Sequence, residues 1–109
     1  MTKTDPLYEL LLEENITEFN NRRAKGERPH LAGCVLRGRD LRGLIVDGLD
    51  MSDAYLRGAD LRGIDFRNCN LEGASLAEAK ISGCYFPKAL SADEIRLSIE
   101  KGTRLRYNK

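Results

Sequence analysis

The sequence has no tryptophan, a single histidine, three cysteines and almost no excess of charge. Its net charge of +1 comes from 18 basic and 17 acidic residues, so strong non-specific attraction to nucleic acid is not expected. No apolar run approaches the ~20 residues of a membrane span, and the N-terminus lacks the apolar core of a signal peptide. With 109 residues and few aromatic side chains, the chain has the length of one small domain whose core needs another means of packing.

A five-residue repeat provides that packing. Every fifth residue from 31 to 86 is apolar, and we predict that these twelve repeat centres point inward. The period fits neither an α-helix nor a continuous strand, but it fits a short extended segment followed by a corner. Two residues after the centre stands glycine eight times, and Asp53 and Asn68 at this place also tolerate turn conformations.

A second, longer period predicts how the segments stack. Residues 36–43 and 56–63, which lie four repeats apart, are identical at seven of eight positions. A coil with four sides of one repeat each explains this offset, and residues four repeats apart then lie above one another. The predicted interior columns are Leu31, Met51 and Leu71; Leu36, Leu56 and Leu76; Leu41, Leu61 and Ile81; and Val46, Phe66 and Phe86.

Segments such as 59–63 (Ala-Asp-Leu-Arg-Gly) and 74–78 (Ala-Ser-Leu-Ala-Glu) resemble the pentapeptide repeat family, whose motif reads Ala, Asp or Asn, Leu and two variable residues. The resemblance covers about residues 29 to 88. It implies an all-β solenoid, a right-handed four-sided (quadrilateral) β-helix of about three coils. We expect one structural domain with an N-terminal helical cap at 1–28, the β-helix at 29–90, and a C-terminal helical cap with a basic tail at 91–109.

The flanking segments carry the helix signals behind this division. Asp5 followed by Pro6 predicts a helix start. Asn15 with Glu18, and Ser91 with Glu94, resemble capping boxes. A stack of coils exposes unpaired backbone edges at both ends, and we expect these short α-helices to cover them.

Cysteine and histidine are frequent catalytic residues and metal ligands, but their positions in this sequence indicate a structural role. Cys34, Cys69 and Cys84 each stand two residues before a repeat centre and fall in different columns, so we expect small buried thiols in a reducing compartment. His30 is expected to face outward, with no nucleophile or paired carboxylate aimed at it. The sequence therefore predicts no catalytic, cofactor-binding or metal-binding residue, no cofactor, no enzymatic activity, and a cytoplasmic location.

Arginines are the exposed side chains that the stacking aligns. Arg37 and Arg57 are expected to stack on one face and Arg42 and Arg62 on the next, with Arg39 at the corner between them. Two interpretations stay open. The arginines form either a solubilising charge ladder, whose surface pairs contribute little to stability, or a surface that binds a partner.

The leading hypothesis is a rigid, non-enzymatic scaffold that binds another protein, of unknown identity, through a flat face or an end. The alternative is a DNA mimic that binds a type II topoisomerase, as the resemblance implies for some members. The charge balance of residues 29–90 disfavours mimicry, because eight basic residues face eight acidic ones. These are Arg37, Arg39, Arg42, Arg57, Arg62, Arg67, Lys80 and Lys88, against Asp40, Asp47, Asp50, Asp53, Asp60, Asp65, Glu72 and Glu78.

The same balance disfavours direct nucleic-acid binding by the arginine faces, because the chain has no basic excess. We expect no small-molecule substrate and no membrane contact, and the charge balance disfavours a nucleic acid partner. The expected state is a monomer or a weak homodimer.

Overall fold

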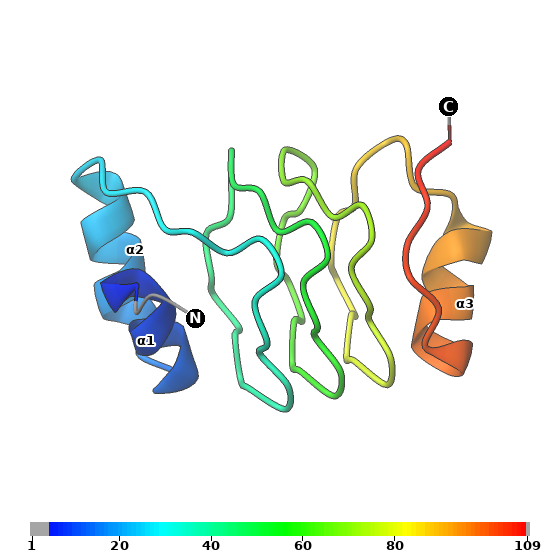
Figure 1. Cartoon of the computed structure of the whole chain (residues 1–109), viewed down its shortest axis with the longest axis horizontal. Helices are drawn as coiled ribbons and strands as arrows, with labels where there is room; N and C mark the ends of the chain where they lie inside the picture. The colour runs from blue at the N-terminus through cyan, green and yellow to red at the C-terminus, as the bar shows by residue number, and fades with distance from the viewer. Residues whose placement is uncertain (1–4, 109) are drawn as a thin grey trace.

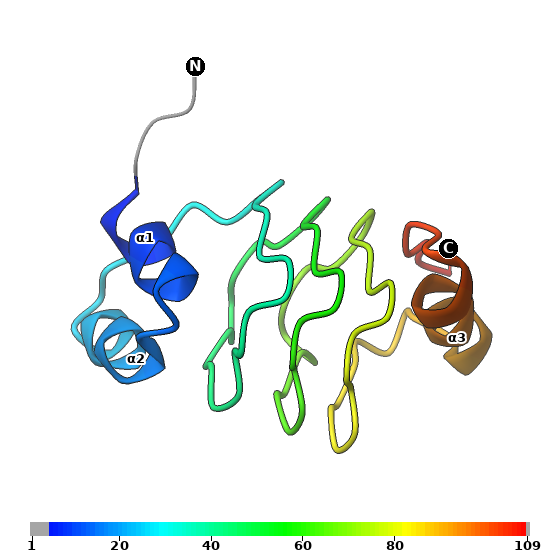
Figure 2. The same ribbon diagram turned by 90° about the horizontal axis from the view of Figure 1, so that it is seen from below.

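The computed structural model describes residues 5–108, which form a stack of coils with helices at both ends (Figure 1). Helices α1 (Pro6–Leu12) and α2 (Ile16–Ala24) lie together at one end, and α3 (Ala92–Lys101) lies at the other. The molecule measures 35 × 26 × 24 Å along its principal axes. The segment after α3 runs back along the last coil, beside the helix (Figures 1 and 2).

The coils pair with one another in parallel at an offset of four repeats. Val35 pairs with Tyr55, and Tyr55 pairs with Ser75 on the next level. Their backbones are joined by hydrogen bonds such as Leu36 N to Tyr55 O (2.9 Å) and Tyr55 N to Cys34 O (2.8 Å). The four-repeat offset read from the sequence is therefore the spacing of the paired residues.

The pairing consists of isolated bridges, and the described residues form no continuous strand or sheet. The reason lies in the length of one side. Each side has five residues, of which two form the corner, so the extended part is too short for an uninterrupted ladder. We expected an all-β solenoid. Within the described residues the coils show its parallel pairing, but they form no regular strands.

Left-handed backbone conformations mark the corners. The eight glycines that follow a repeat centre by two residues all have positive φ, from 69° to 86°. Two corners without glycine also have positive φ, at Asp53 (59°) and Glu78 (58°). Asn68, which the sequence suggested for such a corner, does not take this conformation. Glu78 shows that the repeat geometry imposes the conformation even on a residue that does not favour it.

The repeat centres fill the interior of the coils. Ten of the twelve are at most 1% exposed, from Leu31 to Leu76. Phe66 and Phe86 stack with their ring centroids 5.7 Å apart and their planes 14° apart. Ile81 and Phe86, the last two centres, are only half-buried. They differ from the predicted full burial because no further coil lies above them and α3 covers them only in part.

The helix ends follow the capping signals, but both predicted capping boxes are only half formed. The side chains of Asp5, Asn15 and Ser91 each accept a hydrogen bond from a backbone N–H of the helix that they begin. At α2, Glu18 N donates to Asn15 Oδ1 (3.3 Å), while Asn15 N donates to Leu10 O (2.8 Å) and not to the Glu18 carboxylate. At α3, Ser91 Oγ accepts from Glu94 N (3.1 Å), but the Glu94 carboxylate turns away to Arg106 (2.9 Å). The capping box predicted there is only half formed, because the arginine of the following segment offers a charged donor.

The segment that follows α3 packs against the last coil. Leu105 is 1% exposed and exchanges two backbone hydrogen bonds with that coil, one to Ala74 O and one from Gly73 N, both 2.8 Å. Arg104 pairs with Ser75 in an antiparallel bridge. The predicted basic tail is thus a structural part of the C-terminal end, while the three-part division of the chain stays a prediction.

Candidate functional site

The arginine ladder begins from a unit of two residues, an aspartate and the arginine two positions later. Arg62 donates two hydrogen bonds to the carboxylate of Asp60, from Nε at 2.8 Å and from Nη2 at 2.7 Å. Arg42 donates two hydrogen bonds to Asp40 in the same way, at 2.9 and 2.8 Å, and Arg67 donates two to Asp65, at 3.0 and 2.8 Å. We call these units Asp–Arg forks.

The corner of the coil builds the forks locally. The aspartate stands just before the repeat centre and the arginine just after it, and both point outward. One oxygen of Asp60 also accepts the backbone N–H of Arg62 (3.3 Å), and Asp65 Oδ1 accepts that of Arg67 (3.0 Å). An aspartate that bonds the backbone two residues later forms an Asx turn, so the corner holds the carboxylate ready for the guanidinium.

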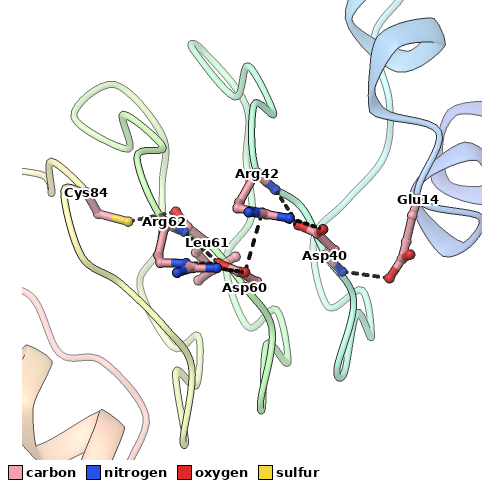
Figure 3. Close-up of polar contacts among 7 residues, drawn as sticks. All are labelled: Glu14, Asp40, Arg42, Asp60, Leu61, Arg62 and Cys84. Atoms are coloured by element: carbon pink, nitrogen blue, oxygen red, sulfur yellow. Dashed lines mark hydrogen bonds and ion pairs between the residues drawn. The ribbon is translucent and has the colours of Figure 1, made fainter.

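Figure 3 shows two forks joined across neighbouring coils. Nε of Arg42 lies 3.4 Å from Oδ2 of Asp60, so acid and base alternate from Asp40 through Arg42 and Asp60 to Arg62. At one end of this row, Asp40 N donates to Glu14 Oε2 (2.7 Å). In the last coil Lys80 stands at the place of the aspartate, and the row of forks stops there.

Each fork lowers the pKa of its carboxyl group. The guanidinium of Arg62 holds the pKa of Asp60 at about 2, and that of Arg67 holds the pKa of Asp65 at about 2. Hydrogen bonds from Arg42 likewise lower the pKa of Asp40. The partners keep each other charged at neutral pH, and the ladder presents fixed pairs of opposite charge.

The other three candidate arginines differ in their partners. Arg57 pairs with Glu78 at 3.2 Å in an exposed ion pair. Arg37 is exposed, and within residues 5–108 its guanidinium makes no hydrogen bond or ion pair. Arg39 donates to the carbonyl of Leu12 (3.0 Å) and so ties α1 to the first coil. The five arginines of the predicted face therefore have different surroundings. Arg42 and Arg62 are held in forks, and Arg57 makes an ordinary ion pair. Arg37 is unpaired among the described residues, and Arg39 contacts α1.

The outer edge of the first coil shows contacts that sequence reasoning missed. On each of the four sides one backbone N–H would lack a partner, and each donates instead to a side chain of the N-terminal segment. The pairs are His30 N to Asp5 Oδ2 (2.7 Å), Val35 N to Tyr8 Oη (3.0 Å), Asp40 N to Glu14 Oε2 (2.7 Å) and Ile45 N to Asn20 Oδ1 (3.1 Å). The donors are one repeat apart, but the acceptors follow no period that would have revealed them.

The opposite edge is covered on two sides. Leu71 N donates to Tyr107 Oη (2.8 Å) and Gly73 N to Leu105 O (2.8 Å). On the next side, Leu76 N donates to the buried Ser98 Oγ (2.8 Å), and Glu78 N donates to Ile99 O (3.0 Å). Residues 79–88 form the remaining two sides of this edge.

The predicted chemical groups lie as follows. Cys34 and Cys69 are buried, and burial raises the pKa of each thiol to about 12. Cys84 is half-buried, its pKa is also raised by burial, and its thiol lies 2.9 Å from Leu61 O (Figure 3). His30 is exposed. Across residues 5–108, no three histidine, cysteine or acidic side chains gather as metal ligands would.

None of the helices in the described part of the chain is both long and apolar enough to cross a membrane.

Comparison with protein families identifies the repeats. The model of the family described as pentapeptide repeats matches residues 50–86, in eight copies. The match lies inside the segment 29–88 that the sequence indicated, and the coil before it pairs with the matched region through bridges such as Asp40 to Asp60. No curated protein and no solved structure matches the chain. The five-residue period, the parallel pairing at an offset of four repeats and this match together identify the repeats of this chain as pentapeptide repeats.

Proposed function

We propose that this protein is a rigid, non-enzymatic scaffold that binds another protein, and that its repeats wind as a right-handed four-sided β-helix. The filled interior supports rigidity, because the repeat centres from Leu31 to Leu76 are buried. The raised pKa values of the Cys34 and Cys69 thiols support a structural role for both, since a protonated thiol is a poor nucleophile.

The observation that carries the proposal is the row of Asp–Arg forks. Binding through long side chains normally costs the conformational entropy of ordering them. Arg42 and Arg62 are already ordered by two hydrogen bonds each, yet their side chains are 54% and 44% exposed. A partner that meets this face meets a surface whose shape and charge pattern are set in advance.

The unpaired Arg37 and the exposed Arg57 lie on the neighbouring side of the coils. Arg37 makes no ion pair among residues 5–108, and Arg57 makes a single exposed one with Glu78, so neither guanidinium is held in a fork and both can turn to acidic groups of a partner. Charge complementarity of this kind contributes to association rate and specificity. We therefore place the partner contact on Arg37 and Arg57, with the forks as the adjoining fixed surface.

Capture experiments with charge-reversed baits test this function. The wild-type protein, the double variant Arg37→Glu/Arg57→Glu, and the control variant Arg67→Glu are immobilised and exposed to native cell extract. Arg67 forms the same kind of fork on another side, so its reversal changes charge equally for each residue replaced. A partner protein should bind wild type and Arg67→Glu, and should bind the double variant at least tenfold more weakly.

Two outcomes would count against the proposal. Equal capture of the partner by all three baits would exclude the Arg37 and Arg57 surface. If no protein is enriched over an inert bait of the same size, the scaffold function itself is contradicted.

The alternative of a DNA mimic has a separate test. The forks place a guanidinium beside each carboxylate at Asp40, Asp60 and Asp65, so these positions offer no row of uncompensated negative charge. We expect no inhibition of DNA supercoiling by a type II topoisomerase at micromolar protein. Inhibition would overturn this charge argument.

A further inference from the structure

On two sides of the last coil, backbone groups at the open edge have no partner among residues 5–108. One coil below, the equivalent groups are all bonded: Lys80 N donates to Ala59 O (3.0 Å), Leu61 N to Lys80 O (2.9 Å) and Gly63 N to Ser82 O (2.9 Å). Four repeats later, within the described chain, Ala79 O accepts no hydrogen bond, and the N–H groups of Ile81 and Gly83 donate none.

The adjoining side repeats the pattern. Phe66 N donates to Tyr85 O (2.7 Å), and Tyr85 N donates to Ile64 O (3.1 Å). The groups one coil above, Phe86 N and Cys84 O, have no partner among residues 5–108. Two successive sides therefore offer an unpaired row in the order acceptor, donor, donor, acceptor, donor. Edges of this kind accept further strands.

An apolar groove lies along the same edge. It has a volume of about 400 Å³ and runs between the last coil and α3. Ile81, Cys84 and Phe86 line its coil side. Ala92, Ile95 and Ile99 line its helix side, together with the charged residues Arg96 and Glu100. The half-burial of Ile81 and Phe86 follows from this groove, because α3 leaves part of each side chain uncovered. The size lies within the range of pockets that hold small ligands.

We infer that this edge and groove bind an extended apolar segment of a partner protein, which adds one more strand in parallel to residues 79–86. The inference rests on the proposed function of protein binding and names a contact distinct from the arginine surface. The unpaired groups dictate the register. One residue of the segment donates to Ala79 O and accepts from Ile81 N, and the residue two positions later accepts from Gly83 N. The residue between them points into the groove over Ile81 and must be apolar.

The bonded amides of the N-terminal edge argue against head-to-tail stacking of a second copy on the open edge. Head-to-tail stacking of two chains would require the free edge of a first coil, but its amides at Val35, Asp40 and Ile45 already donate to Tyr8, Glu14 and Asn20. A second copy would have to detach α1 and α2 to take this place. A foreign extended segment needs no such change.

The repeats themselves supply a probe peptide. The sequence of residues 59–66, Ala-Asp-Leu-Arg-Gly-Ile-Asp-Phe, lies directly below the open edge in the folded chain. Placed one coil above it, the peptide would set its leucine on Ile81, its isoleucine on Cys84 and its phenylalanine on Phe86. We propose titrating the acetylated and amidated peptide into the isotope-labelled full chain and following the backbone amides by NMR.

The expected result is saturable binding with a dissociation constant below about 1 mM. The amide signals of Ile81, Gly83 and Phe86 should shift and exchange more slowly with solvent, while those of Val35 and Asp40 stay unchanged. A peptide with its first aspartate N-methylated lacks the donor for Ala79 O and should bind at least tenfold more weakly.

Two protein variants serve as a matched pair. Ala92→Glu places a larger charged side chain in the groove at an exposed position, where the first turn of α3 tolerates an acid. Leu97→Glu adds the same charge to the same helix at a residue that does not line the groove. Ala92→Glu should weaken peptide binding at least fivefold, and Leu97→Glu should leave it unchanged.

Three results would overturn the inference: no shift at the groove amides, equal binding of the N-methylated peptide, or a dimer that forms through the groove without peptide. The first two leave the proposed function standing if the partner still depends on Arg37 and Arg57. If the wild-type protein captures no partner from the extract but still binds the peptide, the proposed function is contradicted and the inference about the groove is not.

Discussion

The two ends of the coil stack face the same physical problem and meet it differently. At the N-terminal end, four side chains of one helical segment bond four backbone amides, one on each side of the first coil. At the C-terminal end, within the described residues, α3 and the segment after it bond the last coil on two sides. The difference teaches that covering an edge depends on where acceptors are placed, since both ends have helices.

The largest effect is expected from removing the C-terminal cover. Deleting residues 91–109 would leave all four sides of the last coil open and expose Leu90 and Phe86. We predict association or aggregation, because an open edge beside apolar surface pairs with other chains. Size-exclusion chromatography with light scattering measures this. A truncated chain that stays monomeric and as stable as the full protein would show that α3 is no cap.

Substitutions of Phe66 and Phe86, which belong to one interior column, compare the middle of the stack with its open end. Phe66→Ala removes a fully buried ring and should cost about 3–5 kcal/mol of unfolding free energy. Phe86→Ala removes the half-buried ring stacked on it and should cost less, about 1–3 kcal/mol. Urea unfolding measures both. Equal losses would mean that the last coil is as closed as the middle one.

Single acceptors allow a finer comparison of the two ends. Ser98→Ala removes the partner of Leu76 N at a site without solvent access and should cost about 1–3 kcal/mol. Tyr8→Phe removes the hydroxyl that bonds Val35 N and Val35 O at an exposed site, and should cost about 1 kcal/mol. Unfolding curves of the two variants decide the order, and a larger loss for Tyr8→Phe would contradict it.

The smallest expected effect is the loss of stability at low pH when the Asp60 carboxylate is protonated. The pKa of Asp60 is held at about 2 by Arg62, below the ordinary value of about 3.9 in an unfolded chain. A depressed pKa in the folded state stabilises the fold above the unfolded pKa, and this contribution is lost as the pH falls toward 2.

The stability of the wild type should therefore fall more between pH 4 and about pH 2 than that of Asp60→Asn. The control Asp53→Asn changes a carboxylate of another side whose contact with Arg104, at 3.5 Å, is an exposed ion pair and not a fork. If wild type and Asp60→Asn lose stability in parallel, the fork does not persist in solution.

The sequence predicts the periodic part of the molecule well, because a period constrains every residue that shares it. The offset of four repeats places Asp40 beside Asp60, and the alternation around each centre places Leu61 inside and Arg62 outside. The Asp–Arg forks could have been foreseen from the same spacing, since corner residues two positions apart share one face.

The non-periodic parts resist such reasoning. Nothing local to Tyr8 or Asn20 says that these side chains meet amides of the first coil, because the meeting depends on how α1 and α2 settle on that coil. The turn of Glu94 toward Arg106 likewise depends on a segment beyond the helix. The half-burial of Ile81 depends on the line that α3 takes across the last coil.

Amide hydrogen exchange, read residue by residue by NMR, tests the unequal ends most directly. We predict that the amides of His30, Val35, Asp40 and Ile45 exchange at least tenfold more slowly than those of Ile81, Gly83 and Phe86, after correction for intrinsic rates. The first four have side-chain acceptors at 2.7 to 3.1 Å, and the last three have none within the described chain. Equal protection of the two sets would contradict the claim that one end is closed on four sides and the other on two.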